Sequence, residues 1–425
     1  MKMSVKRQFI QELEGLRGGA AVAVLVTHLA QTWWSNQQSW GVFTSLISFG
    51  SLAVIVFFFL SGFVIGHTTP KHFSVHNLRC YLLRRILRLG PIFWLAVTFS
   101  FWICGWPLVS NAFALHLGFL HSVATPIVPS NGPLWSIHFE VVFYLLFIFI
   151  WKWPKLVRWL VICSVIAVLS AVWGLDYIPI RVLGLSIFWI AGFLISRSDK
   201  VDMVIKLNCG NEGKFWVSLF LISAHLAILP LNAILSRVGL SGGWLLGFVI
   251  HIPLLAQLFL APLQRSVKTT FVIPSVLVSL SATLIGLGYA TLNPHLFVVL
   301  GGYGASTILL VMAVVFAVCR FPDPSLSFWR RCAPLGSISF ALYVIHQPIL
   351  DMAMKFNGTS GSGLRTAMLI GCAAVTAFLA AWLLERRFQP QVDRFGKRVF
   401  GGWMRYEDAM DQRAEPQCGA VVNRC

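Results

Sequence analysis

The chain has 425 residues, of which 57% are hydrophobic and 11% charged, and its mean hydropathy is +0.77. Soluble domains carry about 25% charged residues, so this composition excludes a set of ordinary soluble domains and indicates a polytopic membrane protein. The net charge of +18 does not indicate nucleic-acid binding, because Lys and Arg lie in short gaps between apolar segments rather than on one contiguous face.

Apolar segments long enough to cross about 30 Å of hydrocarbon recur along the chain. They predict an all-α fold, a polytopic transmembrane helical bundle of about 10–12 spans. A membrane-embedded domain is expected over residues 1–390, followed by a short polar cytoplasmic tail over 391–425. We place the spans near residues 17–34, 44–66, 90–107, 133–151, 156–174, 180–196, 214–231, 243–263, 270–291, 296–319, 336–354 and 364–384.

The basic residues predict how the chain is oriented. Lys and Arg gather in every second gap, for example over 79–88 and 386–398, whereas the alternate gaps hold few, among them Arg237 and Lys355. By the positive-inside rule, the basic gaps and both termini are cytoplasmic. The prediction is a multi-pass protein of the plasma (inner) membrane, with an uncleaved first span. No membrane span is assigned to residues 108–132, which are predicted to form an extracytoplasmic or re-entrant loop.

The first apolar segment contains His28, 11 residues after Arg17. At about 100° and 1.5 Å per residue, the two share one helix face, with His28 about 16 Å deeper than Arg17. An ionisable group in hydrocarbon is a functional-site hypothesis by default, and a neutral His28 suits a general base acting on a hydroxyl. The alternative is a buried polar pair that only holds helices together. Glu14, one turn before Arg17, can pair with it.

The run Phe57–Phe63 contains the small pair Ser61 and Gly62. Physical chemistry alone favours lipid-facing aromatic packing here, with the small pair allowing a close helix approach.

Arg85 and Arg88 share a helix face at the predicted cytoplasmic edge. Arginine at such a place can bind phosphates bidentately. The alternative is a topological role, with contact only to lipid headgroups.

Glu140 lies just inside the start of a hydrophobic segment, in the run Gly132–Tyr144. A carboxylate there must be paired, protonated or hydrated. Ser136 lies one turn before Glu140, whereas His138 projects to another side and is not expected to form a dyad with it.

Ser339, Tyr343 and His346 are spaced i, i+4, i+7 and therefore share one helix face. A polar stripe inside a span faces a cavity or another helix. Interhelical hydrogen bonding without a catalytic role is the alternative interpretation.

Taken in order, these motifs resemble the acyltransferase 3 family, integral-membrane acyltransferases that modify cell-surface carbohydrates and some lipids or antibiotics. The resemblance covers about residues 12–390 and includes a similar closing signature over Trp382–Phe388. The sequence departs from the family pattern at Glu14, where Asp is usual, at His138, where Ser is common, and at Val141, which replaces a frequent second Glu. The matching motifs are Arg17 with His28, Phe57–Phe63, Arg85 with Arg88, Pro133–Glu140 and Ser339–His346.

The resemblance implies an O-acyltransferase, and we expect an O-acetyltransferase. The donor would be acetyl-CoA or another short acyl-CoA, used as a co-substrate, with no permanently bound cofactor. The acceptor would be a hydroxyl of a lipid-linked or exported carbohydrate. His28 would act as the base, either toward the acceptor or in forming a transient acyl-enzyme. The other roles are positioning of donor and acceptor by Glu140, Tyr343 and His346, and binding of CoA phosphates by Arg17, Arg85 and Arg88, with Glu14 beside Arg17.

A glycolipid transporter or flippase is the competing hypothesis, in which buried His, Glu and Arg form a polar pathway. The chain shows no inverted repeat and no matching pair of Gly/Pro-broken spans, which weakens this reading. No metal site is expected, because the nine cysteines are scattered without a Cys-x-x-Cys pair.

Overall fold

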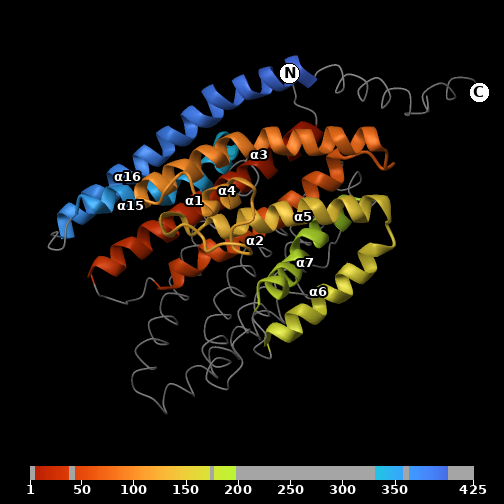
Figure 1. Ribbon diagram of the computed structural model, residues 1–425, viewed down its shortest axis with the longest axis horizontal. Helices are drawn as coiled ribbons and strands as arrows, with labels where there is room; N and C mark the ends of the chain where they lie inside the picture. Colours follow the sequence, from red (N-terminus) through yellow and green to blue (C-terminus); the bar gives the residue numbers. More distant parts are fainter. Residues whose placement is uncertain (1–4, 38–43, 173–176, 198–330, 358–362, 401–425) are drawn as a thin grey trace, which may run out of the picture.

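The computed structural model describes residues 5–37, 44–172, 177–197, 331–357 and 363–400. Every regular element in these ranges is helical, and the helices run roughly side by side (Figure 1). The elements are α1 (Val5–Gln37), α2 (Thr44–Thr68), α3 (Val75–Cys104), α4 (Asn111–Leu117), η1 (Pro129–Asn131), α5 (Leu134–Lys152), α6 (Leu156–Val172), α7 (Ile178–Ser196), α15 (Ser339–Lys355), α16 (Gly363–Leu383) and the π-helical turn η4 (Leu384–Phe388).

Four helices in the described ranges are long and apolar enough to cross a membrane: Leu13–Trp33, Val75–Cys104, Leu134–Lys152 and Gly363–Phe400. The all-α bundle predicted from the sequence is therefore confirmed, whereas the count of 10–12 spans stays a prediction. Four of the predicted spans, 214–231, 243–263, 270–291 and 296–319, lie outside the described residues.

The third predicted span, 90–107, marks only the second half of α3, which begins at Val75. Ser74 caps this helix by accepting a hydrogen bond from the Asn77 N–H at 3.0 Å. Hydropathy detects only the apolar second half of α3, so the predicted span leaves out the arginine-rich first half.

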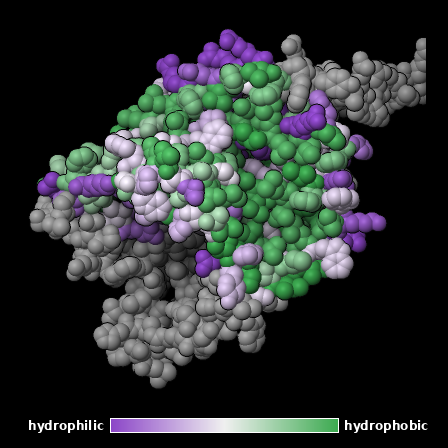
Figure 2. Space-filling view, in the orientation of Figure 1, coloured by the Kyte–Doolittle hydropathy of each residue, from purple (hydrophilic) through white to green (hydrophobic). Residues whose placement is uncertain are grey.

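The outer surfaces of the helices carry large apolar side chains. Trp159 and Ile166 of α6 are 65% and 56% exposed, and Leu379 of α16 is 58% exposed. Figure 2 shows hydrophobic residues over most of the described part of one face, with hydrophilic residues gathered toward its margins. Apolar patches of this extent mark a surface that contacts membrane or protein rather than water.

Helix α2 lies inside the bundle and packs most extensively against α7 and α1. Phe58, Phe59 and Phe63 are almost fully buried, so the prediction that this aromatic run faces lipid was wrong. The predicted close approach at Gly62 is confirmed. A Cβ atom on Gly62 would lie 2.0 Å from the carbonyl oxygen of Trp189 on α7, where no side chain fits.

The segment between α3 and α5 covers the start of α5 and contains only two short helices. α4 has seven residues and η1 has three, too few to cross a membrane. This geometry is consistent with the prediction that residues 108–132 do not cross the membrane.

Candidate active site

The packing of α1 against α15 brings His28 next to His346. The centroids of the two imidazole rings are 5.1 Å apart, and the ring planes are tilted by 41°. His346 is 1% exposed and His28 is half-buried. Two residues that are distant in the sequence therefore form one polar centre between α1 and α15.

The tautomer of His346 follows from its hydrogen bonding. Its Nδ1 lies 3.0 Å from the carbonyl oxygen of Leu342, which can only accept, so Nδ1 carries the proton. In the neutral ring, Nε2 then has a lone pair. This nitrogen is buried and has no hydrogen-bond partner among the described residues. Because an unsatisfied buried acceptor is costly, it indicates a place where a substrate or water donates a hydrogen bond.

Tyr343 joins the histidine pair to α5. Its ring centroid is 6.1 Å from that of His346, and its hydroxyl is 2.6 Å from the Ser136 Oγ. Both hydroxyls lie 3.2 Å from the carbonyl oxygen of Pro133. Since each hydroxyl has one proton, one donates to the other and the second donates to Pro133. Ser136, which sequence analysis noted without assigning a role, is thus in contact with a candidate residue.

Asn131 is a second residue that sequence analysis missed. It is fully buried, and its Nδ2 donates to the Ser100 Oγ at 3.0 Å and to the Val344 carbonyl at 2.9 Å. The side chain links α3 to α15 directly before α5 begins. An Asn before a Gly-Pro pair is typical of an ordinary turn, so the sequence carries no signal of this bridging role.

Glu140 belongs to a different cluster from the histidine pair. It accepts a hydrogen bond from the Tyr144 hydroxyl, while the Arg85 guanidinium lies over the rings of Tyr81 and Tyr144 at 5.5 and 5.2 Å. The Nε of Arg85 is buried without a hydrogen-bond partner in the described ranges. Glu140 and His138 make separate contacts, as predicted.

A small polar pocket of about 30 Å³ borders Arg85 at the end of α2 and the start of α3. Arg84, Thr69 and Asn77 also line it. Positive charge combined with hydroxyl and amide groups suits an anion such as phosphate.

Arg88 contacts a partner that the sequence analysis did not assign to it. Its two terminal nitrogens bind Glu385 bidentately, at 2.6 and 3.1 Å, and the Glu385 side chain is 4% exposed. Glu385 also accepts from the Ala341 N–H at 3.3 Å. Arg85 and Arg88 share a helix face but have different partners, so any phosphate contact by Arg88 must use its remaining N–H groups.

Arg17 pairs with Glu14 at 3.2 Å, as predicted from their spacing. The backbone at Glu14 is in close contact with Gly336, just before α15, because a Cβ on Gly336 would lie 2.0 Å from the Glu14 carbonyl oxygen. This ion pair is partly exposed and lies more than two helical turns from His28.

Three histidines pack together where the 105–133 segment meets α5. The His121 ring centroid is 5.3 Å from that of His116 and 5.7 Å from that of His138. His116 accepts from the Val128 N–H, and His121 donates to the Leu134 carbonyl. Burial lowers the pKa of His121 to about 4 and also lowers the pKa of His116. The hydrogen bonds of His116, donated by Nδ1 to the Ala112 carbonyl and accepted by Nε2, require a neutral ring, whereas the one bond that His121 donates is compatible with either charge state.

Comparison with known proteins supports the family suggested by the motifs. Residues 10–386 match the acyltransferase 3 family model, described as an acyltransferase domain. The chain is 26% identical over 371 residues to acyltransferase MdmB of Streptomyces mycarofaciens, covering 82% of this chain and 81% of that protein. No solved structure matches.

The matched range contains His28, His346, Tyr343 and Glu140, together with all three candidate arginines. The chain belongs to the acyltransferase 3 family, and it is a membrane acyltransferase that transfers acyl groups other than aminoacyl groups.

Proposed function

We propose that this protein transfers a short acyl group, most simply acetyl, from acyl-CoA to a hydroxyl of a lipid-linked or exported carbohydrate. The observation that carries the proposal is the His28–His346 pair, with a buried lone pair on the His346 Nε2. Acyl transfer to a hydroxyl needs a neutral base near the oxygen that attacks. A histidine pair fits this need, because neutral imidazole acts as a general base near pH 7.

In the proposed reaction, His28 accepts the proton of the acceptor hydroxyl as its oxygen attacks the thioester carbonyl carbon. The C–O bond forms, the tetrahedral intermediate collapses and the C–S bond breaks. The CoA thiolate then takes the proton from the His28 imidazolium, which gives an ester and free CoA. His28 releases the same proton that it accepted, so the reaction needs no further reactant.

The neighbouring residues position the reactants. The His346 Nε2 accepts a hydrogen bond from a second hydroxyl of the acceptor, next to the one that attacks, and Tyr343 holds the α5 end of the site through Ser136. Glu140 fixes Tyr144 beside Arg85. Arg85 binds CoA phosphates at the polar pocket next to it. Arg17 and Arg88, whose charges are balanced by Glu14 and Glu385, contribute their remaining N–H groups as donors to the phosphates.

The test is thioester consumption by the purified full-length chain in detergent, supplied with acetyl-CoA and a carbohydrate acceptor. We expect free thiol and acetylated carbohydrate to appear in equal amounts. A transporter would need a sealed membrane and would leave the thioester intact. Absence of thiol release with every short acyl-CoA, from a folded protein, would contradict the proposal.

A further inference from the structure

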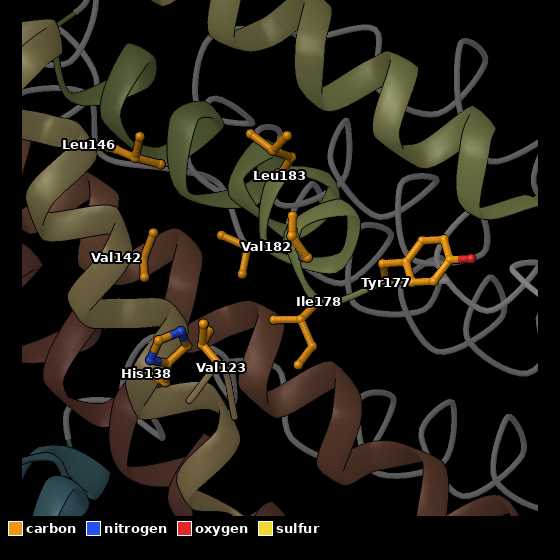
Figure 3. A pocket seen from close by; sticks show the side chains of 9 residues that line it. Val123, His138, Val142, Leu146, Tyr177, Ile178, Val182 and Leu183 are labelled. Atoms are coloured by element: carbon orange, nitrogen blue, oxygen red, sulfur yellow. The ribbon is translucent and has the colours of Figure 1, made fainter. Parts of the chain in front are cut away.

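A second site lies between α5 and α7, separate from the histidine pair. It is a cavity of about 570 Å³, within the range typical of small-molecule sites. Val142 and Leu146 of α5 face Ile178 and Val182 of α7 across it (Figure 3). The described residues that line the cavity include no Lys, Arg, Asp or Glu, which disfavours CoA phosphates and favours a hydrocarbon chain.

Two lining residues, His138 and Tyr177, carry polar side-chain groups, and the Tyr177 hydroxyl points away from the other lining side chains (Figure 3), so His138 supplies the polar group inside the cavity. The ring lies beside Val123 at the α5 wall (Figure 3). Its Nδ1 is 2.6 Å from the Phe119 carbonyl oxygen, which only accepts, so Nδ1 carries the proton. In the neutral ring, Nε2 is a hydrogen-bond acceptor. An apolar cavity with one acceptor suits a molecule that has a long chain and a hydroxyl group beside it.

The place of the cavity in the bundle adds a second constraint. It borders the first turns of α7 and the part of α5 from His138 to Leu146, on the side of the α5 start. The orientation predicted from the basic residues puts this end in the outer leaflet. Ser136 and His138 are two residues apart on α5 and project about 200° apart, so Ser136 meets Tyr343 while His138 meets the cavity. A molecule held by His138 is therefore about one helix diameter, roughly 10 Å, from the site.

We propose that this cavity binds the hydrocarbon chain of a glycolipid acceptor, with a sugar hydroxyl donating to the His138 Nε2. The inference rests on the proposed function, because it names the lipid-linked form of the carbohydrate as the substrate. Glycolipid differs from phosphatidylcholine in offering hydroxyl donors next to its chain, which is the chemistry that His138 recognises.

The probe is a photoreactive hexadecyl glucoside, added to the purified full-length chain in detergent, with crosslinks mapped by peptide mass spectrometry. Val142→Trp fills the cavity, and Val165→Trp on the exposed face of α6 is the matched control. We expect crosslinks on α5 and α7 in the wild type and in Val165→Trp, and about tenfold less labelling in Val142→Trp. His138→Phe should remove the advantage of hexadecyl glucoside over phosphatidylcholine as a competitor.

Labelling that Val142→Trp leaves unchanged would overturn the inference, as would equal competition by phosphatidylcholine in the wild type. A second measurement, acetyl transfer to hexadecyl glucoside and to methyl glucoside, tests the proposed function independently of the cavity. If the protein is crosslinked at α5 and α7 but transfers no acetyl group to either acceptor, the lipid site is supported and the proposed function is contradicted. Equal transfer to both acceptors without crosslinks at α5 and α7 would contradict the site alone.

Discussion

The ring centroids of His28 on α1 and His346 on α15 are 5.1 Å apart. The contact depends on tight packing of the two helices, since a Cβ atom on Gly18 of α1 would lie 2.6 Å from the backbone nitrogen of Gly336. Residues near the two ends of the sequence thus share one centre, and the helices that hold it approach at backbone distance.

Gly62 tests the packing of α2 against α7. Gly62→Ala should lower stability by about 1–3 kcal/mol, because the added methyl group would overlap the Trp189 carbonyl oxygen. Gly371→Ala on α16 is the matched control, since no described atom beyond the neighbouring residues and backbone of its own helix lies within 4 Å of its Cβ position. Thermal unfolding in detergent measures both. A Gly62→Ala protein as stable as the Gly371→Ala protein would contradict the close approach.

The Arg88–Glu385 pair predicts a coupled effect on stability. Arg88→Met leaves a buried carboxylate unpaired and should cost about 1–3 kcal/mol, a range reduced because Arg88 is partly exposed. Adding Glu385→Gln should restore much of the loss. Arg386→Met, which alters an exposed neighbour of Glu385, should have little effect. Additive losses in the double variant, measured by thermal unfolding, would show that the pair does not stabilise the fold.

Arg85 predicts phosphate-dependent use of the donor. The wild type should prefer acetyl-CoA to S-acetylpantetheine, which lacks the phosphates. Arg85→Met should reduce this preference about 10- to 100-fold, the range for one charge-assisted hydrogen bond. The measurement is the ratio of kcat/KM for the two donors. A general loss of activity lowers both values equally and leaves this ratio unchanged. An unchanged ratio would show that Arg85 does not bind the phosphates of the donor.

His121 predicts acid sensitivity of the 105–133 segment. Its pKa of about 4 lies below the ordinary value of 6.5, so the unfolded chain binds more protons between these values. Stability should be complete above pH 6.5 and fall by about 3 kcal/mol toward pH 4. His116 and His138 face His121 and add to the repulsion once charged. His121→Gln should flatten the unfolding profile over this range, and an unchanged slope would exclude His121 as the cause.

The sequence was sufficient to predict the helices of the described ranges and one contact between candidate residues. Periodicity and hydropathy identified α1, α2, α5, α6, α7, α15 and α16, because burial in a bundle and crossing of a membrane require the same apolar lengths. The i, i+3 spacing also predicted the Glu14–Arg17 pair. Contacts within one helix are available from sequence, since helix geometry fixes them.

Contacts between helices were harder to predict. Nothing local indicates that Glu385 binds Arg88 or that Asn131 reaches Val344. An acidic residue at the end of an apolar segment does require a partner, so Glu385 could have been assigned to one of the arginines in the basic gaps, although not to Arg88 in particular. The aromatic run Phe57–Phe63 was misassigned because hydropathy is the same for lipid-facing and buried positions.

The most direct test of the histidine pair is transfer of labelled acetyl from acetyl-CoA to a carbohydrate acceptor by matched amounts of folded variants. His28→Ala should lower transfer about 10²- to 10⁴-fold, as expected for loss of a general base. His346→Ala should lower it less, because His346 positions the hydroxyl. His72→Ala, which changes an exposed histidine far from the pair, should match the wild type. Full transfer by His28→Ala would contradict the assignment of His28 as the base.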